Sequence, residues 1–389
     1  MARAKRSNPN PPADAAPRRL SKPAAPVAKA VPPSPARADD AAYDATPACG
    51  AMTFEPSASH EAFPPDAPGL PKLGMVCLSS DQQCSFRSIT RQQFLKLDPD
   101  EQAGRLLGIY WENTQRLHWT LGYCARRKIA LYRATSGLYP MSDEPLGRGV
   151  LTNLPATLSS VGRRAERLGI RMLLHPDQFV VLNSETPATV ETSRKILDKH
   201  ALWFDLFGLA QTPWNAINLH GGKGGRADEL VAVVADLPDN VRRRLTFEND
   251  EYSYSAEEIL AICRRTGCPM VFDCHHHVIR EKLDSYDHPS VAYFTRAARD
   301  TWPKPGWQVC HVSNGETAFR DRYHALHVTM MPRAFRDVPW LEVEARGKEQ
   351  AILRLRLGWP TSGDPPPGFP LEKPTGTTKA RKHRAGAEI

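Results

Sequence analysis

Short apolar runs alternate with longer amphipathic stretches between residues 72 and 356 of this 389-residue chain. Eight of the runs are continuously apolar, which is typical of strands buried on both faces of a parallel sheet. They span residues 73–79, 129–135, 170–175, 215–220, 244–249, 269–273, 307–313 and 340–345. Helical spacing predicts helices between them, over residues 106–127, 154–169, 186–208, 227–238 and 255–267. Eight βα units of this length predict an α/β fold, the (β/α)₈ TIM barrel.

The two ends of the chain have a different composition. Residues 1–71 are rich in Pro and Ala, carry basic clusters and lack apolar periodicity, which predicts a disordered basic arm. A mitochondrial transit peptide is the alternative, but the prolines oppose an amphipathic helix. Residues 357–389 form a second Pro-rich basic segment. We therefore expect disordered arms at 1–71 and 357–389 on either side of a barrel domain at 72–356.

The charge balance favours an anionic partner such as nucleic acid, since 51 Lys and Arg face 43 Asp and Glu. Eight cysteines without a C-x-x-C pair, and no secretory signal, indicate free thiols in a reducing compartment. No apolar run approaches the ~18 to 20 residues that cross a bilayer. We expect no membrane contact and a cytoplasmic, nucleoid-associated location, or a nuclear one in a eukaryote.

Six successive predicted strands end in, or are followed by, histidine or a carboxylate. In a TIM barrel these ends converge on one mouth. Imidazole and carboxylate are ligands for borderline divalent metals. Because one catalytic metal takes about three protein ligands, the set predicts a cluster of two or three ions, with Glu248 as a possible bridge. In strand order the residues are His175, His220, Glu248, Asp273, His311 and Glu344.

The sixth predicted strand runs into three adjacent histidines, in the segment VFDCHHHVIR at 271–280. Asp273 and His276 are spaced so that both can turn toward one ion, with His275 and His277 directed elsewhere. A solvated polar turn is the alternative. The sequence alone leaves open which of the three histidines is a ligand.

Ordered segments of the chain resemble the motifs of the UV damage endonuclease family. They are LYRATSGLYP (131–140), LHPDQF (174–179), NLHGG (218–222), FENDE (247–251), FDCHHH (272–277), CHVS (310–313) and EVEARGKE (342–349). The resemblance implies a TIM barrel with a divalent cluster, most often Mn²⁺, that nicks DNA 5′ to ultraviolet photoproducts and leaves a 3′ hydroxyl. It also implies a metal-ligand set of His175, His220, Glu248, Asp273, His276, His311, His324 and Glu344.

The same resemblance implies lesion-probing roles for Gln178 and Phe179, although Phe179 has the alternative of a core position beside the third strand. Lys223 and Arg226, in a glycine-rich segment, are candidate contacts to the DNA backbone, or the segment is only a turn. Arg133 is a candidate phosphate contact or a partner in an ion pair at the barrel mouth. The implied partner is double-stranded damaged DNA, and we expect a monomer without an organic cofactor.

Two positions depart from the family pattern. Met75 stands where the family has a tyrosine that can support distorted DNA, and Val309 stands where the family often has a lysine that can be carboxylated. Both substitutions put the corresponding family roles in doubt for this chain, and they leave open an altered lesion preference.

For the chemistry, we expect Glu248, Asp273 and His220 to hold an ion that activates water, while another ion stabilises the leaving 3′ oxygen. Three alternatives remain: an abasic-site endonuclease of the endonuclease IV type, a sugar isomerase on the same barrel, and a non-enzymatic DNA-binding protein. The number of histidines disfavours the isomerase. The tripeptide at 322–324 lacks the Asp-x-His of abasic-site enzymes, and the complete ligand set argues against a non-enzymatic protein.

Overall fold

Eight parallel strands close into a barrel in the computed structural model, which describes residues 63–360. Each strand pairs with its neighbours in sequence, and β8 pairs with β1 to complete the ring. The strands are β1 (Lys72–Val76), β2 (Leu131–Ala134), β3 (Arg171–Leu174), β4 (Ile217–His220), β5 (Leu245–Glu248), β6 (Met270–Asp273), β7 (Val309–Val312) and β8 (Trp340–Val343). The predicted strands and the TIM barrel are confirmed.

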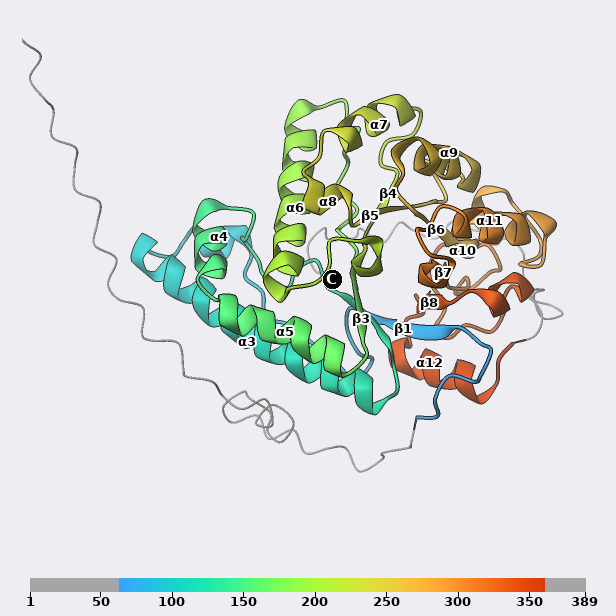
Figure 1. Ribbon diagram of the computed structural model, residues 1–389, viewed down its shortest axis with the longest axis horizontal. Coiled ribbons are helices and arrows are strands. Elements are labelled where there is room, and N and C mark those ends of the chain that lie inside the picture. The colour runs from blue at the N-terminus through green and yellow to red at the C-terminus, as the bar shows by residue number, and fades with distance from the viewer. Residues whose placement is uncertain (1–62, 361–389) are drawn as a thin grey trace, which may run out of the picture. The chain divides into compact units, whose positions relative to one another are not determined.

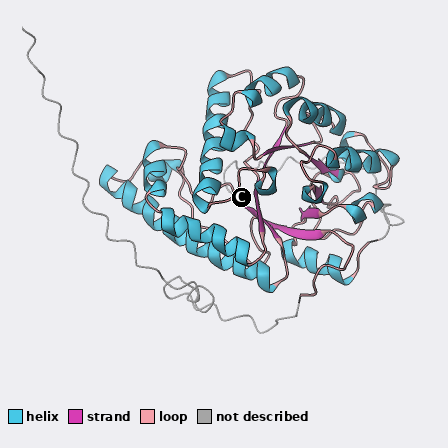
Figure 2. Cartoon of the chain, in the orientation of Figure 1, coloured by secondary structure: helices cyan, strands magenta, loops and turns pink. Residues whose placement is uncertain are grey.

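Helices surround the strands on the outside, as Figures 1 and 2 show. They are α2 (Arg91–Phe94), α3 (Pro99–Arg126), α4 (Pro145–Thr152), α5 (Pro155–Arg167), α6 (Pro187–Phe207), α7 (Ala227–Ala235), α8 (Asp239–Arg242), α9 (Ala256–Thr266), α10 (Cys274–Arg280), α11 (Pro289–Arg299) and α12 (Lys348–Leu357). Short 3₁₀ turns are η1 (Pro213–Asn215), η2 (Pro305–Trp307) and η3 (Arg333–Asp337). The five predicted helices correspond to α3, α5, α6, α7 and α9.

Helix α9 illustrates how the local sequence sets the ends of these helices. Ser255 and Glu258 form a reciprocal capping box, which satisfies backbone donors that the first helical turn leaves free. Gly267 ends the helix with a φ of 73°, a left-handed conformation that glycine adopts without a steric penalty. The apolar side chains of Ile259 and Ile262 are buried in the core between helices and barrel. Capping and amphipathicity therefore agree on the same boundaries.

Most of the predicted disordered arm and tail lies outside the described residues. Residues 63–71 of that arm are described, and they contact the barrel domain. Asp66 Oδ1 accepts a hydrogen bond from Nε of Arg356 at 2.6 Å, and the guanidinium of Arg127 lies over the ring of Phe63. The packed part of the chain therefore includes residues before 72, since Asp66 pairs with the buried guanidinium of Arg356. Within residues 63–360, no helix combines the length and apolar character that crossing a membrane requires.

A buried arginine closes the N-terminal floor of the barrel. The guanidinium of Arg171, on β3, donates to the carbonyl oxygens of Trp214, Trp307 and Pro213 at 2.7, 2.9 and 3.1 Å. It also lies over the rings of Trp214 and Trp340, 4.4 and 5.3 Å from their centroids. One cation thus satisfies several buried carbonyl groups and packs on indole faces.

The Arg171 floor predicts a large effect on stability. Replacing Arg171 by Met would leave the three carbonyl oxygens without donors and should lower the free energy of unfolding by about 2–4 kcal/mol. Urea unfolding followed by circular dichroism measures the change. Arg163→Met, at an exposed position of α5, is the matched control and should cost less than ~0.5 kcal/mol. Equal stability of the two variants would contradict this role.

Candidate metal centre

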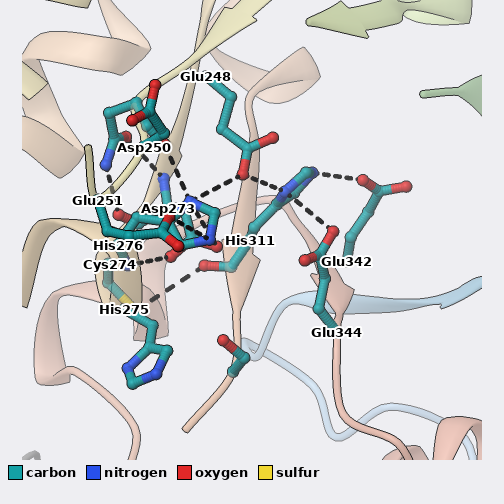
Figure 3. A network of polar contacts seen from close by, with 12 residues as sticks. Glu248, Asp250, Glu251, Asp273, Cys274, His275, His276, His311, Glu342 and Glu344 are labelled. Atoms are coloured by element: carbon teal, nitrogen blue, oxygen red, sulfur yellow. Dashed lines mark hydrogen bonds and ion pairs between the residues drawn. The ribbon is translucent and has the colours of Figure 1, made fainter. Parts of the chain in front are cut away.

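Histidine and carboxylate side chains from six consecutive strands meet at the C-terminal mouth of the barrel. They lie in and below a cavity of about 530 Å³, whose wall includes His175, His220, His276 and Glu344. Figure 3 shows the contacts of Glu248 and His311 at the centre of this group. The convergence follows from the fold, because all eight parallel strands point their C-terminal ends toward the same mouth.

Three sets of side chains have ligand atoms close enough to share an ion. They are His175–His220–Glu248, Glu248–Asp273–His276 and Asp273–His311–Glu344, and within each set the atoms lie within 4.8 Å of one another. Glu248 belongs to the first two sets, and Asp273 belongs to the last two. A chain of adjacent ion positions linked by two shared carboxylates is therefore compatible with the arrangement.

Asp273 caps the first turn of α10 with one carboxylate oxygen and leaves the other without a hydrogen bond in the described part of the chain. As the N-cap residue, its Oδ1 accepts a hydrogen bond from the backbone N–H of His276 at 2.8 Å. This tight turn brings the His276 ring back over the strand end, where Nδ1 lies 3.4 Å from Oε1 of Glu248. The second carboxylate oxygen of Asp273 is left for another partner.

The two neighbouring histidines are engaged elsewhere. His275 is buried, with Nε2 2.9 Å from the carbonyl oxygen of Asp321 and Nδ1 2.6 Å from the hydroxyl of Tyr286. In Figure 3 its ring points away from Glu248. Nε2 of His277 lies 2.9 Å from the hydroxyl of Ser290. Of the three histidines, His276 is the one that lies in a candidate ligand set.

Glu248 is held by amide and hydroxyl groups in the barrel interior. Nδ2 of Asn218 donates to Oε2 of Glu248 at 2.6 Å, and Oδ1 of Asn218 accepts from the hydroxyl of Thr246 at 2.8 Å. The other oxygen, Oε1, lies 3.0 Å from Nδ1 of His311. Contacts within the protein therefore orient both carboxylate oxygens of Glu248 without a bound ion.

Burial and charge move the pKa values of these groups in different directions. Burial lowers the pKa of His220 to about 4, so this imidazole is neutral at pH 7. Burial opposes the charge on His276 as well, but the carboxylates of Asp273 and Glu248 outweigh it and raise the pKa to about 9. Burial raises the pKa of Asp273, whereas for Glu344 Arg133 overcomes burial and holds the pKa below its usual range.

The donor set fits divalent ions. Among the described residues, Nδ1 of His220 and Oδ2 of Asp273 are buried without a hydrogen-bond partner. A bound ion is one way in which such atoms can be satisfied. Both residues belong to the three-residue sets, and their nitrogen and oxygen donors suit Mn²⁺ or Zn²⁺.

Comparison with known proteins agrees with this geometry. The family model described as UV-endonuclease UvdE matches residues 71–359. The chain belongs to this family. The resemblance of its motifs to the UV damage endonuclease family is therefore confirmed.

Relatives in the UvdE family include two curated proteins, each named UV DNA damage endonuclease. One, from Nostoc sp., is 49% identical over 291 residues, which cover 74% of this chain and 90% of the relative. The other, from Deinococcus radiodurans, is 47% identical over 298 residues, which cover 76% of this chain and 98% of the relative. The crystal structure of SacUVDE superimposes with a TM-score of 0.61 at 24% identity, covering 73% of this chain and 96% of that one. At that identity it supports the fold alone.

Seven of the eight predicted metal ligands in this UvdE chain fall into the three sets. The eighth, His324, follows β7 on a loop, forms a β-bridge with Gly315 and lines the cavity. None of the three sets includes it. Its ligand role stays a prediction.

The predicted lesion-probing pair lies beside the cavity, in a segment of which Gln178 and Val180 line the wall. Phe179 is 62% exposed, so it is not the core residue that was the alternative. Gln178, next to it, is exposed and lines the cavity. The turn that carries them is anchored by Asp177, whose Oδ1 accepts from the hydroxyl of Ser136 at 2.6 Å.

The glycine-rich segment after β4 is tied down by Asn183. The Asn183 side chain accepts from the backbone N–H of Lys223 at 2.8 Å and donates to the carbonyl oxygen of Arg226 at 3.1 Å. Gly222 has a φ of 81°, and a Cβ there would lie 2.4 Å from Asn183 Oδ1, so glycine is required. Nζ of Lys223 pairs with Glu185 at 2.9 Å and is half exposed, whereas Arg226 donates to the carbonyl oxygen of Asn183.

Arg133 and Glu342 form a buried charged layer beneath the ligand sets. Arg133 pairs with Glu344 and lies 3.5 Å from Glu342, so the ion-pair role is the one that the geometry shows. A phosphate contact by Arg133 stays a prediction. Sequence reasoning missed Glu342, although it stands two residues before Glu344, and strand periodicity places both on one face.

Both departures from the family pattern lie inside the barrel domain. Met75, on β1, is fully buried in the main core. Val309, at the start of β7, is buried in the apolar cluster that contains Trp340. Neither side chain replaces the polar group that the family pattern has at that place.

The raised pKa of His276 predicts metal binding linked to proton release. Below pH ~9 the metal-free imidazole is protonated, and ligation needs it neutral, so Mn²⁺ affinity should rise about tenfold per pH unit for each proton released. Calorimetry at pH 7 in buffers of different ionisation enthalpy counts the protons. His276→Asn should release about one proton fewer. Binding without proton release would contradict the prediction.

Proposed function

We propose that this protein is a divalent-metal-dependent DNA repair endonuclease. It nicks the phosphodiester immediately 5′ to ultraviolet photoproducts, cyclobutane dimers and 6-4 photoproducts, and leaves a 3′ hydroxyl. The substrate is double-stranded damaged DNA, and the protein acts as a monomer without an organic cofactor. We place it in the cytoplasm with the nucleoid, or in the nucleus of a eukaryote. Family membership and the curated relatives named UV DNA damage endonuclease support this proposal.

The observation that carries the proposal is the overlap of the three ligand sets below an open cavity. Glu248 and Asp273 are each shared by two sets, which suits a cluster of two or three ions, most readily Mn²⁺. Divalent ions bound there would neutralise phosphate oxygens, lower the pKa of bound water and stabilise a leaving alkoxide. A phosphodiester needs all three effects.

Neighbouring groups of the protein orient the side chains of this site and set their protonation. Asn218 orients Glu248, the first turn of α10 orients Asp273, and burial keeps His220 neutral at physiological pH. Glu248 is shared by the set that contains His220 and the set that contains Asp273. We therefore assign these three residues to two adjacent ion positions, one of which would activate water. Because these groups are fixed by neighbours in the barrel wall, little reorganisation is needed when substrate arrives.

Recognition of the lesion is assigned to the exposed pair beside the cavity. A photodimer stacks poorly, so extruding it costs less than the few kcal/mol that a normal base pair demands. Phe179 can insert its ring into the resulting gap, and Gln178 can hydrogen-bond to unpaired bases. Lys223, Arg226 and Arg133 are assigned to backbone phosphates, with Lys223 the most accessible of the three.

A panel of end-labelled duplexes tests the proposal. With Mn²⁺ present, the purified protein should cut immediately 5′ to a cyclobutane dimer or a 6-4 photoproduct, and not in undamaged DNA. Mapping the 3′ end of the product on a sequencing gel identifies the position and the terminal hydroxyl. Cutting at an abasic site alone would replace the proposal by the abasic-site endonuclease, and no cutting with persistent DNA binding would favour a non-enzymatic role.

The Glu248→Gln variant separates chemistry from binding in the same assay. Nicking should fall by more than about 100-fold, because even a partner of a metal ligand is commonly worth about 10- to 100-fold. Affinity for dimer-containing DNA should stay within about threefold. Glu257→Gln, an exposed carboxylate on α9, is the matched control and should leave both unchanged.

The exposed ring of Phe179 predicts a selective loss of lesion recognition. Phe179→Ala should lower kcat/KM on dimer-containing duplex by about 10- to 100-fold, the equivalent of losing one base–aromatic stack. Phe179→Tyr should retain it. Tyr293→Ala removes a ring that is 52% exposed on α11, outside the cavity wall, and serves as the control. Equal rates for the Phe179 and Tyr293 variants would remove Phe179 from the recognition step.

A further inference from the structure

Glu342 is a buried carboxylate that lies beside the ligand sets without belonging to any of them. Its side chain is 1% exposed, and β7–β8 pairing sets it opposite His311 in the strand register. Figure 3 shows the His311 ring between Glu248 and Glu342, with Glu344 below it. The proposed reaction assigns no task to Glu342.

The two ring nitrogens of His311 face different partners. Nε2 contacts Oε2 of Glu342, whereas Nδ1 lies 3.0 Å from Oε1 of Glu248 and 3.3 Å from Oε1 of Glu344. In a neutral imidazole one nitrogen carries the proton and the other offers a lone pair. With the Nε2 proton placed against Glu342, the lone pair of Nδ1 would face Glu248 and Glu344.

Glu342 is itself held by a contact with Arg133. Nη1 of Arg133 lies 3.5 Å from Oε2 of Glu342 and also pairs with Glu344, so one guanidinium contacts both the carboxylate on β8 and the carboxylate that follows the strand. His311 is fully buried, so bulk water has no access to replace the carboxylate. The orientation of the ring thus depends on a contact within the protein.

We propose that Glu342 is a positioning residue, which holds His311 with Nδ1 toward the ion set formed with Asp273 and Glu344. The proposal rests on the proposed metal-dependent function. Glu342 would not touch substrate or ion. Its contribution would be to fix the ring orientation and the tautomer of His311, so its loss should weaken one ion position while the set His175–His220–Glu248 keeps its own.

Two variants of similar size separate orientation from packing. Glu342→Gln keeps an oxygen that can accept Nε2–H, whereas Glu342→Leu fills the space without an acceptor. Free Mn²⁺ is measured by electron paramagnetic resonance during titration of the full chain without DNA. Glu342→Leu should bind its weakest ion about 10- to 100-fold less tightly than the unsubstituted protein, and Glu342→Gln should stay within a few-fold. Added Mn²⁺ should restore nicking by the Leu variant.

Glu349→Gln is the matched control. Glu349 is also a fully buried carboxylate, but it accepts hydrogen bonds from the backbone N–H and hydroxyl of Ser80, away from the ligand sets. Its substitution should leave Mn²⁺ affinity unchanged. Thermal unfolding in EDTA checks that each variant folds, and if the Leu variant does not fold, Glu342→Met takes its place.

Three outcomes overturn the proposal. Wild-type Mn²⁺ affinity in the Leu variant would show that Glu342 does not position His311, and losses as large in the Gln variant as in Glu344→Gln would make Glu342 a ligand. No Mn²⁺ binding by the unsubstituted protein would remove the ion set itself. By contrast, Mn²⁺ binding without nicking of photoproduct DNA would refute the proposed function and leave the affinities to decide the role of Glu342.

Discussion

Four carboxylates crowd together at the mouth of this barrel, and their mutual repulsion is the constraint on which the rest of the site depends. Glu248, Asp273 and Glu342 are almost completely buried, and Glu344 is close to them. Burying a carboxylate is costly unless cations or hydrogen bonds compensate. Imidazoles, amides and one guanidinium supply some of that compensation. Burial still raises the pKa of Asp273, so these groups do not fully offset the cost of its buried charge. Divalent cations bound in the candidate sets would supply such compensation, because one ion can contact several carboxylates at once.

Polar contacts in the barrel interior are arranged in layers from the N-terminal floor to the mouth. At the floor, the guanidinium of Arg171 donates to three carbonyl oxygens and packs against the surrounding indoles. Above it, Thr246 donates to Asn218 and Asn218 donates to Glu248, which orients this carboxylate. Arg133 contacts Glu342 on β8 and Glu344 just after it. The ligand sets therefore rest on strand positions, which are more rigid than loops. The groups that would meet DNA stand on the loops above.

The loops at the mouth carry a different kind of residue from the strand ends. Phe179 and Tyr252 are large, exposed and close to the cavity, and Arg322 lies over the ring of Tyr252. Exposed aromatic rings next to a cation suit contact with unstacked bases rather than with a protein core. The base of the cavity thus carries acidic and imidazole side chains, and its mouth carries exposed aromatic rings.

The sequence by itself predicted the barrel and most of the residues that meet in the three candidate sets, because each strand is a short apolar run that ends at the common mouth. That local rule predicted His220, Glu248 and Asp273 without any tertiary information. Only the tertiary structure decided which of the adjacent histidines faces the site, that Arg133 pairs with carboxylates, and that Glu342 contacts His311. These arrangements depend on strand register and on which side chains meet across the closed barrel. Glu342 and His311 are 31 positions apart in the chain, so no local sequence pattern indicates their contact.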